Sequence, residues 1–582
     1  MRSNKHETSH GGARPSRRAF VKGLAKGGVI ATFGTWRSTA WAQPPRAVHA
    51  GGLSGSDFEL QIGESLVDYT GSPRIAHTVN GSLPAPALRW TEGDTVTLRV
   101  SNTLPRDSAS IHWHGILLPA NMDGVPGLSF DGIGPGESYV YRFHVRQAGT
   151  YWYHSHSAFQ EQLGLYGPLI IDPREPEPFR YDREHVVMLS DWTDEQPERV
   201  FAKLKKQSDY YNFHQRTLGD LLGDLGERGL GRTLADRHAW GMMRMKPTDL
   251  ADVSGATYTY LMNGTAPAGN WTGLFRPGER VRLRFVNGSA MTYFDVRIPG
   301  LKMTVVQADG QNVHPVSVDE FRIAVAETMD VLVEPSGQDA FTVFAQSMDR
   351  TGYARGTLAV RAGLSAPVPE PDPRPLLTMA DMGHGAHAGT EGAGAPPAPH
   401  GGGHDHQPSQ LHPASEEGNP LVDMQAMSPS SRLDDPGIGL RENGRRVLTY
   451  ADLHSAFDDP DGREPGRTVE LHLTGHMERF AWSFDGIKFS DAAPLRLTYG
   501  ERLRIVLVND TMMAHPIHLH GMWSDLEDDH AEFQVRKHTV DMPPGTRRSY
   551  RVTADALGRW AYHCHLLFHM EAGMFREVRV QE

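Results

Sequence analysis

One cysteine occurs in the whole chain, Cys564, and it lies in the segment 563–574, whose sequence is HCHLLFHMEAGM. A cysteine without a partner cannot form a disulfide within its own chain. This one instead has a histidine on each side, a third histidine at position 569 and a methionine at position 574. Two imidazoles, one thiolate and a weak axial thioether are the ligands of a blue-copper electron-transfer site. The segment therefore predicts a metal site that handles single electrons.

The spacing around the cysteine also predicts how that site connects to its surroundings. If residues 563–565 form a strand, His563 and His565 face one side and Cys564 faces the other. One short strand would then join two different metal sites, with the thiolate on one face and two imidazoles on the opposite face. The pattern therefore predicts an electron path between neighbouring metal centres.

The same His-x-His spacing occurs four times, twice near each end of the chain. The pairs are His112 and His114, His154 and His156, His518 and His520, and His563 and His565. On a strand, the two imidazoles of each pair point to one face. A single pair is a weak signal, but four pairs at matching positions, one of which encloses the only cysteine, indicate metal binding.

The number of histidines suggests what the second centre does. A blue site formed by His515, Cys564, His569 and Met574 leaves the eight paired histidines, which suit three coppers at a domain interface. Reduction of dioxygen to water consumes four electrons and four protons, and clustered coppers can deliver electrons together. The other histidines, such as His144, His214, His238, His472 and His538, are expected to be surface or satisfied structural residues.

An internal repeat predicts the elements that position these residues. The segments 93–102, 278–287 and 500–509 align without gaps. Each has a Gly-acid turn, then polar and apolar residues in alternation, then an asparagine, which is typical of a half-buried β-strand. We therefore expect an all-β protein with three β-sandwich domains, at about 45–175, 180–365 and 431–582.

Two regions depart from this pattern. The second unit has no His-x-His pair and is expected to be a structural spacer, with a helical insertion at about 196–246. Residues 366–430 are rich in Pro, Gly, His and Met and poor in β-branched residues. Such a composition cannot bury a core of its own, so a disordered Met/His-rich linker is expected before the third domain.

The first 42 residues have the features of a twin-arginine signal peptide. Arg17 and Arg18 precede a short apolar stretch at 23–33, and 40–42 (Ala-Trp-Ala) suits a signal peptidase. The apolar stretch is too short to span a membrane. Export to the periplasm is the expected outcome, and a basic, disordered N-terminus is the alternative.

Charge limits the class of partner. The chain carries −12 at neutral pH, and residues 1–42 contribute +7, which leaves about −19 after their removal. An acidic protein of this kind is not expected to bind nucleic acid. It is compatible with cationic substrates, although acidic surfaces also serve solubility.

At these histidines and the cysteine, the chain resembles the multicopper oxidases, the class of laccases, ascorbate oxidases and bacterial cuprous oxidases. The resemblance implies three cupredoxin-like Greek-key domains and four coppers per chain. It assigns type 1 copper to His515, Cys564, His569 and Met574, type 2 copper to His112 and His518, and the two type 3 coppers to His114, His154, His156, His520, His563 and His565.

The resemblance also bears on proton supply. Members of the family have an acidic residue after the first motif that feeds protons to the cluster, and Asp123 is similar to it in position. Some cuprous oxidases of the class have a glutamate directly before the last blue-site histidine. That position is Phe568 here, so a second proton donor is not expected there.

Outside the ligand motifs, segments 160–169 (QEQLGLYGPL), 432–440 (RLDDPGIGL) and 535–540 (VRKHTV) resemble the periplasmic copper-resistance oxidases of the copper-resistance protein A type. This implies oxidation of Cu(I) to Cu(II) with reduction of O2 to water, Met/His repeats that capture copper, and periplasmic or outer-membrane partners. We expect a monomer. Laccase-like oxidation of phenols, or mainly copper sequestration, are the alternatives.

The residues around His515 suggest where a cuprous substrate could bind. Met512, Met513, Met522 and Glu527 offer soft sulfur and a carboxylate near this motif, and thioethers favour Cu(I). The alternative is that these are core methionines and a solvated acidic loop. We further expect His515 and His569 to present an exposed imidazole edge through which electrons reach the blue copper.

Overall fold

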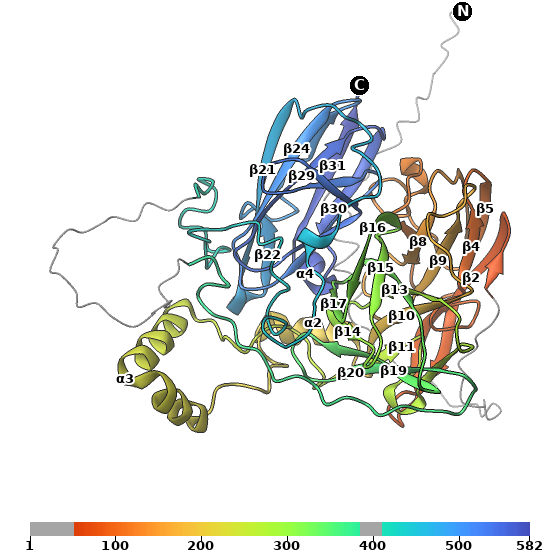
Figure 1. Ribbon diagram of the computed structural model, residues 1–582. Helices are drawn as coiled ribbons and strands as arrows, with labels where there is room; N and C mark the ends of the chain where they lie inside the picture. The colour runs from red at the N-terminus through yellow and green to blue at the C-terminus, as the bar shows by residue number, and fades with distance from the viewer. Residues whose placement is uncertain (1–51, 385–409) are drawn as a thin grey trace, which may run out of the picture.

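A computed structural model describes residues 52–384 and 410–582, so the predicted signal peptide lies outside the described residues. Within the described residues, β-strands form six sheets and three α-helices occur. The sheets pair into three sandwiches that meet at a common centre (Figure 1). The prediction of an all-β protein with three sandwich domains is confirmed.

The first domain pairs a five-stranded sheet with a four-stranded sheet. The first sheet has the order β1 (Leu53–Ser54), β4 (Leu88–Thr91), β9 (Tyr166–Asp172), β8 (Gly149–His154) and β6 (His112–His114). The second has the order β3 (Arg74–Val79), β2 (Asp57–Val67), β5 (Thr95–Asn102) and β7 (Ser138–His144). Every residue of β6 and β8 is buried, because one face lies on the domain core and the other meets the second and third domains.

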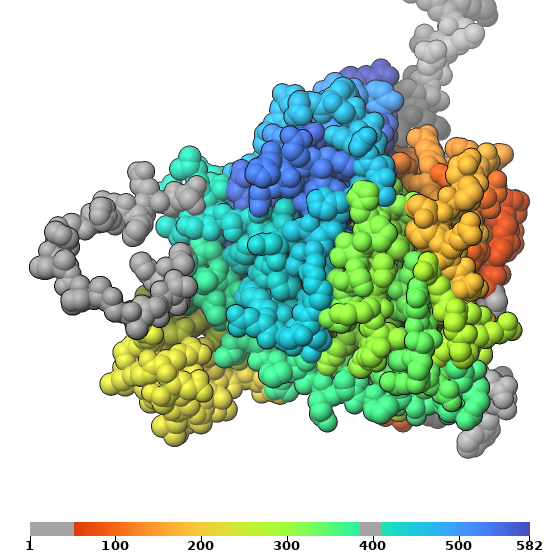
Figure 2. All heavy atoms as spheres, in the orientation of Figure 1, coloured from red at the N-terminus to blue at the C-terminus, as the bar shows by residue number. Residues whose placement is uncertain are grey.

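The second domain is larger and contains the predicted helical insertion. One sheet has the order β11 (Tyr258–Met262), β10 (Arg183–Thr193), β13 (Val281–Asn287), β18 (Thr328–Val333), β15 (Met303–Ala308) and β16 (Gln311–Val318). The other has the order β12 (Trp271–Leu274), β20 (Tyr353–Ala359), β19 (Ala340–Ser347), β14 (Phe294–Arg297) and β17 (Glu320–Ile323). Helices α2 (Pro197–Lys206) and α3 (Leu218–Met243) form the insertion, and α3 projects away from the sandwiches (Figures 1 and 2).

The third domain carries the cysteine. One sheet has the order β22 (Ala481–Phe484), β21 (Arg467–His476), β24 (Arg502–Asn509), β29 (Arg547–Thr553), β26 (Ser524–Glu527) and β27 (Phe533–Lys537). The other has the order β23 (Leu495–Thr498), β31 (Phe575–Gln581), β30 (Gly558–Cys564), β25 (His515–Leu519) and β28 (Thr539–Met542). A short helix, α4 (Leu567–Glu571), follows the cysteine.

The asparagine that ends each repeat has a structural reason. Asn102, Asn287 and Asn509 close β5, β13 and β24 and are fully buried. In each case the side-chain amide donates to two backbone carbonyls, and its oxygen accepts from the N–H two residues later. Asn509 donates to the carbonyls of Met513 and Met542, so it fixes the loop that leads into β25.

The prediction of a disordered linker is wrong for the part that the structure describes. Met382 and Ala426 are fully buried, and Met424 is 6 % exposed. Backbone hydrogen bonds tie residues 410–430 to β21 and to the segment before residue 384. The composition argument failed because this segment does not need a core of its own. It packs on surfaces that the second and third domains already provide.

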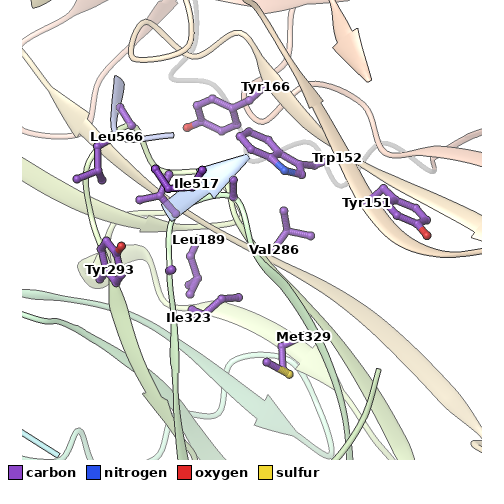
Figure 3. Packing of buried hydrophobic residues seen from close by; sticks show 14 of the residues in the cluster. Tyr151, Trp152, Tyr166, Leu189, Val286, Tyr293, Ile323, Met329, Ile517 and Leu566 are labelled. Atoms are coloured by element: carbon purple, nitrogen blue, oxygen red, sulfur yellow. The ribbon is translucent and has the colours of Figure 1, made fainter. Parts of the chain in front are cut away.

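The three domains share one apolar junction. Trp152 and Tyr166 of the first domain, Leu189 and Val286 of the second, and Ile517 of the third belong to one buried cluster (Figure 3). Burial of such side chains contributes roughly 1.5–3 kcal/mol each relative to exposure. The junction therefore holds β8 of the first domain against β25 of the third.

Replacement of Asn509 by alanine tests the role of the terminal asparagine. Asn509→Ala removes four hydrogen bonds of the buried side chain, which should lower the free energy of unfolding by about 2–4 kcal/mol. It should also shift the visible spectrum of the copper protein, because the loop before His515 loses its anchor. Asn287→Ala is the matched control and should lower stability to a similar degree without a spectral change. Equal spectra for the two variants would contradict this role.

Candidate metal centre

The predicted blue site assembles where β25, β30 and α4 meet. The sulfur of Cys564 lies 3.5 Å from Nδ1 of His515 and 3.8 Å from Nδ1 of His569, and the two nitrogens lie 3.0 Å apart. Met574 is fully buried, and its carbonyl accepts from the N–H of Cys564 at 3.1 Å. Three donor atoms at these separations suit the trigonal His2Cys arrangement with an axial methionine nearby.

The ladder between β25 and β30 sets this geometry. The two strands run antiparallel, with Ile517 opposite Cys564 and His518 opposite His563. After Cys564 the chain turns into α4, which brings His569 back beside His515. The predicted strand at 563–565 ends at Cys564, but the N–H of His565 still donates to the carbonyl of Pro516 at 2.7 Å.

The eight paired histidines gather at the interface of the first and third domains, on or next to β6, β8, β25 and β30. Groups whose donor atoms lie within 4.8 Å of one another include two triads that share no residue, one of His114, His154 and His565 and one of His156, His520 and His563. Overlapping groups join His112 and His518 to His520, and His518 and His538 to His114. The rings of His112 and His518 lie 5.8 Å apart beside them. The resemblance gave six of these residues as one set, and the structure divides that set into two triads.

The ring nitrogens are arranged as metal ligands require. Nδ1 of His112 lies 2.8 Å from the carbonyl of Asp123, and Nδ1 of His518 lies 2.6 Å from the carbonyl of His538. The Nε2 atoms of both rings are buried and have no hydrogen-bond partner among the described residues. An imidazole with one nitrogen held by an outer acceptor and the other free is the usual form of a metal ligand. These residues therefore fit a bound metal.

Protonation states agree with this arrangement. Burial lowers the pKa of His114, His154 and His518 well below the usual value, so these imidazoles are neutral. Neutral imidazole is the form that binds metal. Burial raises the pKa of the Cys564 thiol, so a thiolate here needs a positive charge beside it. A cation between Cys564, His515 and His569 supplies that charge.

The strand also provides the connection that the sequence predicts. Nε2 of His563 lies 3.0 Å from Nε2 of His520, and Nε2 of His565 lies 3.3 Å from Nε2 of His154. The two neighbours of Cys564 therefore reach different triads, while its sulfur faces the blue site. Each triad is thus connected to the cysteine through one residue of backbone.

Two buried carboxylates contact the histidine cluster. Asp123, the expected proton relay, has Oδ2 at 2.8 Å from Nδ1 of His520. Sequence reasoning missed Glu161, whose Oε2 lies 2.7 Å from Nδ1 of His154. Burial raises the pKa of Glu161 well above its usual value. Its position inside the 160–169 motif was the available signal, because that motif contains a charged residue amid an otherwise uncharged run.

The expected exposed edge of the blue site is wrong. His515 and His569 are both 0 % exposed. Oδ2 of Asp252 lies 2.7 Å from Nε2 of His569, and Oγ1 of Thr511 lies 2.7 Å from Nε2 of His515. Asp252 comes from the second domain, so that domain is not only a spacer. Its residues cover the imidazole edge that the sequence left open.

Two of the four residues suggested for a cuprous substrate do not fit that role. Both oxygens of Glu527 accept hydrogen bonds from the guanidinium groups of Arg504 and Arg551. Met522 follows the opposite end of β25 from His515, and the strand alone spans about 13 Å at its usual rise per residue. Met512 and Met513, by contrast, are 1 % and 3 % exposed and lie beside the blue site.

Comparison with known proteins matches this architecture. Family models described as multicopper oxidase match residues 61–176, 183–362 and 462–582. The chain is 68 % identical to the copper resistance protein A homolog of Pseudomonas syringae pv. tomato and 66 % identical to copper resistance protein A of Escherichia coli, covering 98 % of this chain and all of each relative. The crystal structure of Fet3p, a multicopper oxidase that functions in iron import, has a similar fold, with a TM-score of 0.62 at 19 % identity over 91 % of each chain.

Of the helices in residues 52–384 and 410–582, none combines the length and the apolar character needed to cross a bilayer.

Replacement of the cysteine tests the blue site. Cys564→Ser should fold and lose the intense visible band, because only the thiolate gives that charge-transfer colour. It should also bind one copper per chain fewer than the wild type, because the blue site loses its thiolate ligand. Metal analysis and absorbance measure both effects. His77→Gln is the control, since His77 is a buried imidazole of the first domain outside the clusters, and it should keep colour and copper. A blue Cys564→Ser protein would exclude the assignment.

Proposed function

The chain belongs to the multicopper oxidases, and from that premise we propose that it oxidises Cu(I) to Cu(II) in the periplasm as part of copper resistance. Four Cu(I) ions give up one electron each, and one O2 with four protons becomes two water molecules. Copper-resistance relatives at 66–68 % identity over nearly the whole chain support the role.

In this proposal the chain holds four coppers as a permanent cofactor. Type 1 copper takes His515, Cys564, His569 and Met574, and type 2 copper takes His112 and His518. One type 3 copper takes His114, His154 and His565, and the other takes His156, His520 and His563, which are the triads that the structure brings together. Copper bound there supplies single-electron acceptance at the blue centre and delivery of several electrons together to dioxygen.

The observation that carries the choice of Cu(I) as substrate is the Asp252–His569 contact. Oδ2 of Asp252 lies against the imidazole, and the residue is 1 % exposed. Its other oxygen, Oδ1, is buried and has no hydrogen-bond partner in the part of the chain that the structure describes. A carboxylate with a free oxygen beside a blue-site ligand attracts a cation and places it one side chain from the electron acceptor.

Two cavities that share Tyr293 and Met348 in their linings lie between the second and third domains, and Asp252 lines the smaller one. The inner cavity, of about 10 Å³, is lined by Asp252, Met291, Met348 and Met513. The outer cavity, of about 90 Å³, is lined by Met329, Met348 and Met512 among others. Thioethers select Cu(I), whereas a methionine that only fills a core gap needs no cavity beside it.

The size of the inner cavity argues against the laccase alternative. A volume of about 10 Å³ holds one water-sized species and no aromatic ring. A phenol therefore has no direct contact with the edge of His569 in this cavity, because Asp252 covers that edge. A protein that only stored copper would not need the buried cysteine to be linked to the histidine triads. Here β30 carries both Cys564 and His563, which is the link that electron transfer requires.

The buried carboxylates supply protons in this proposal. Glu161 lies against His154, and burial raises the pKa of its carboxyl well above the usual value, which favours the protonated form that can donate. Asp123 lies against His520 and through its carbonyl against His112. One carboxyl therefore stands at each side of the histidine cluster, where oxygen reduction consumes protons. Glu161 takes the place of the donor that Phe568 cannot provide.

Replacement of Asp252 tests whether Cu(I) or a phenol is the specific substrate. Asp252→Asn keeps the shape of the side chain but removes its charge, so kcat/KM for Cu(I) should fall by about tenfold or more, equivalent to about 1.4 kcal/mol. The rate with a small phenol-type reductant should be unchanged or higher, because loss of the carboxylate favours a reduced blue site. Oxygen uptake with each reductant measures both rates.

Methionine variants provide the control for this experiment. Met348→Leu and Met513→Leu should also lower kcat/KM for Cu(I), since each removes a sulfur from the cavities. Met303→Leu, in the core of β15 and away from both cavities, should leave it unchanged. If all of these variants affect Cu(I) and phenol oxidation equally, Cu(I) is not the specific substrate.

Export by the twin-arginine pathway is part of the proposal and rests on Arg17 and Arg18. Replacement of both by lysine should leave the precursor in the cytoplasm, because the pathway reads the paired guanidinium groups. Cell fractionation and immunoblotting measure the distribution. A lysine variant that reaches the periplasm in normal yield would refute this assignment.

A further inference from the structure

Four ionisable side chains meet in the third domain, away from the histidine cluster and the blue site. They are His412 and Glu416, from the segment before the domain, His472 of β21, and Asp510, which follows β24. The side chains of Glu416 and Asp510 are 0 % exposed, that of His472 is 1 % exposed and that of His412 is 11 % exposed. Sequence reasoning had placed His472 among the surface or structural histidines.

The donor atoms of this group point to one another. Nδ1 of His412 lies 3.2 Å from Oε2 of Glu416 and 3.3 Å from Oδ2 of Asp510. Nδ1 of His472 lies 2.5 Å from Oδ2 of Asp510 and 3.5 Å from Oε1 of Glu416. Neighbouring ligands at 2.0–2.1 Å from a metal are about 2.9 Å apart in a square-planar or tetragonal site, which Cu(II) prefers, and about 3.3 Å apart in a tetrahedral site. The four separations, from 2.5 to 3.5 Å, lie around these values.

Three of the four side chains also have an outer partner on their other polar atom, and Glu416 has one on Oε2. Nε2 of His412 lies 3.2 Å from the carbonyl of Ala426, and Nε2 of His472 lies 3.4 Å from Oε1 of Glu470. The N–H of Ala426 donates to Oδ1 of Asp510, and the amide of Gln425 donates to Oε2 of Glu416. Metal-binding imidazoles and carboxylates are oriented by outer contacts of this kind.

One oxygen of this group has no hydrogen-bond donor. Oε1 of Glu416 is buried and has no hydrogen-bond partner within residues 52–384 and 410–582. It faces Nδ1 of His472. Because an unpaired buried carboxylate oxygen is costly, a cation between these four side chains would remove a penalty that the protein otherwise bears.

We propose that His412, Glu416, His472 and Asp510 form a separate binding site for a divalent transition-metal cation, with Cu(II) as its preferred occupant. The inference does not depend on the proposed oxidase substrate, because it uses no residue of the blue site, the histidine triads or the methionine cavities.

The donor types select the oxidation state. Two imidazoles and two carboxylates offer only nitrogen and oxygen, whereas Cu(I) prefers sulfur. Among divalent first-row cations, affinity for such donors peaks at Cu(II), with Zn(II) below it. The site therefore suits Cu(II), whereas the methionine-lined cavities suit Cu(I).

The competing reading is an ion-pair network without metal. Burial by itself would lower the pKa of His472, yet contact with Asp510 raises it to about 9, so a protonated imidazole can neutralise the acids. Such a network would tie the segment at 410–430 to β21 but would bind no ion. The number of coppers bound per chain distinguishes a metal site from an ion-pair network.

The test uses the full-length oxidase with its catalytic coppers loaded. The protein is incubated with CuCl2 and desalted, and bound copper is counted by mass spectrometry. The wild type should retain one more copper per chain than His472→Gln. His314→Gln, on the exposed edge of β16, is the control and should match the wild type. The blue absorbance should be equal in all three proteins.

A second variant covers the case in which His472→Gln does not fold. Glu416→Gln keeps the shape of the side chain and should weaken Cu(II) binding by about tenfold or more, measured by calorimetry. It should also reduce the rise in Tm that Cu(II) gives the wild type. Equal copper content and equal affinity in the wild type and both variants would overturn the proposal. Tighter binding of Zn(II) than of Cu(II) would overturn the choice of metal.

Discussion

The register between β25 and β30 is the constraint on which the metal centres depend. Ile517 stands opposite Cys564 and His518 opposite His563, so the faces of both strands are fixed together. A slip of one residue would turn the sulfur of Cys564 towards the histidine cluster and His563 towards the blue site. Packing of Ile517 into the junction of the three domains makes such a slip costly, because it would bury an imidazole among apolar side chains.

The second domain has a larger part in the site than its lack of paired histidines suggests. It provides Asp252 against His569, and its Met291, Met329 and Met348 line the cavities that lead there. A domain without paired histidines therefore covers the edge of His569. In the proposed function, the same arrangement disfavours bulky reductants and offers sulfur and carboxylate donors to an ion.

The segment between the second and third domains is similarly more than a connection. Its described parts pack into the surface of the third domain, where Ala426 binds Asp510 and His412 meets His472. The turn that carries Asp510 is the one that Asn509 closes and that leads to His515. The proposed Cu(II) site and the blue site thus share one short loop as a support while using different donors.

The sequence by itself determined the fold class, the three repeated domains, the helical insertion and the chemistry around Cys564. Those features are local: alternation sets a strand, and His-x-His spacing sets which imidazoles share a face. Only the tertiary structure showed which histidines lie within ligand distance of one another, that Asp252 contacts His569 and Glu161 contacts His154, and that His515 and His569 are covered. These contacts join residues up to several hundred positions apart, and no spacing in the chain encodes a distance across a domain interface. Glu527 and Met522 illustrate the same limit, because both are close to His515 in sequence. In the structure Glu527 is paired with Arg504, and Met522 follows the opposite end of β25.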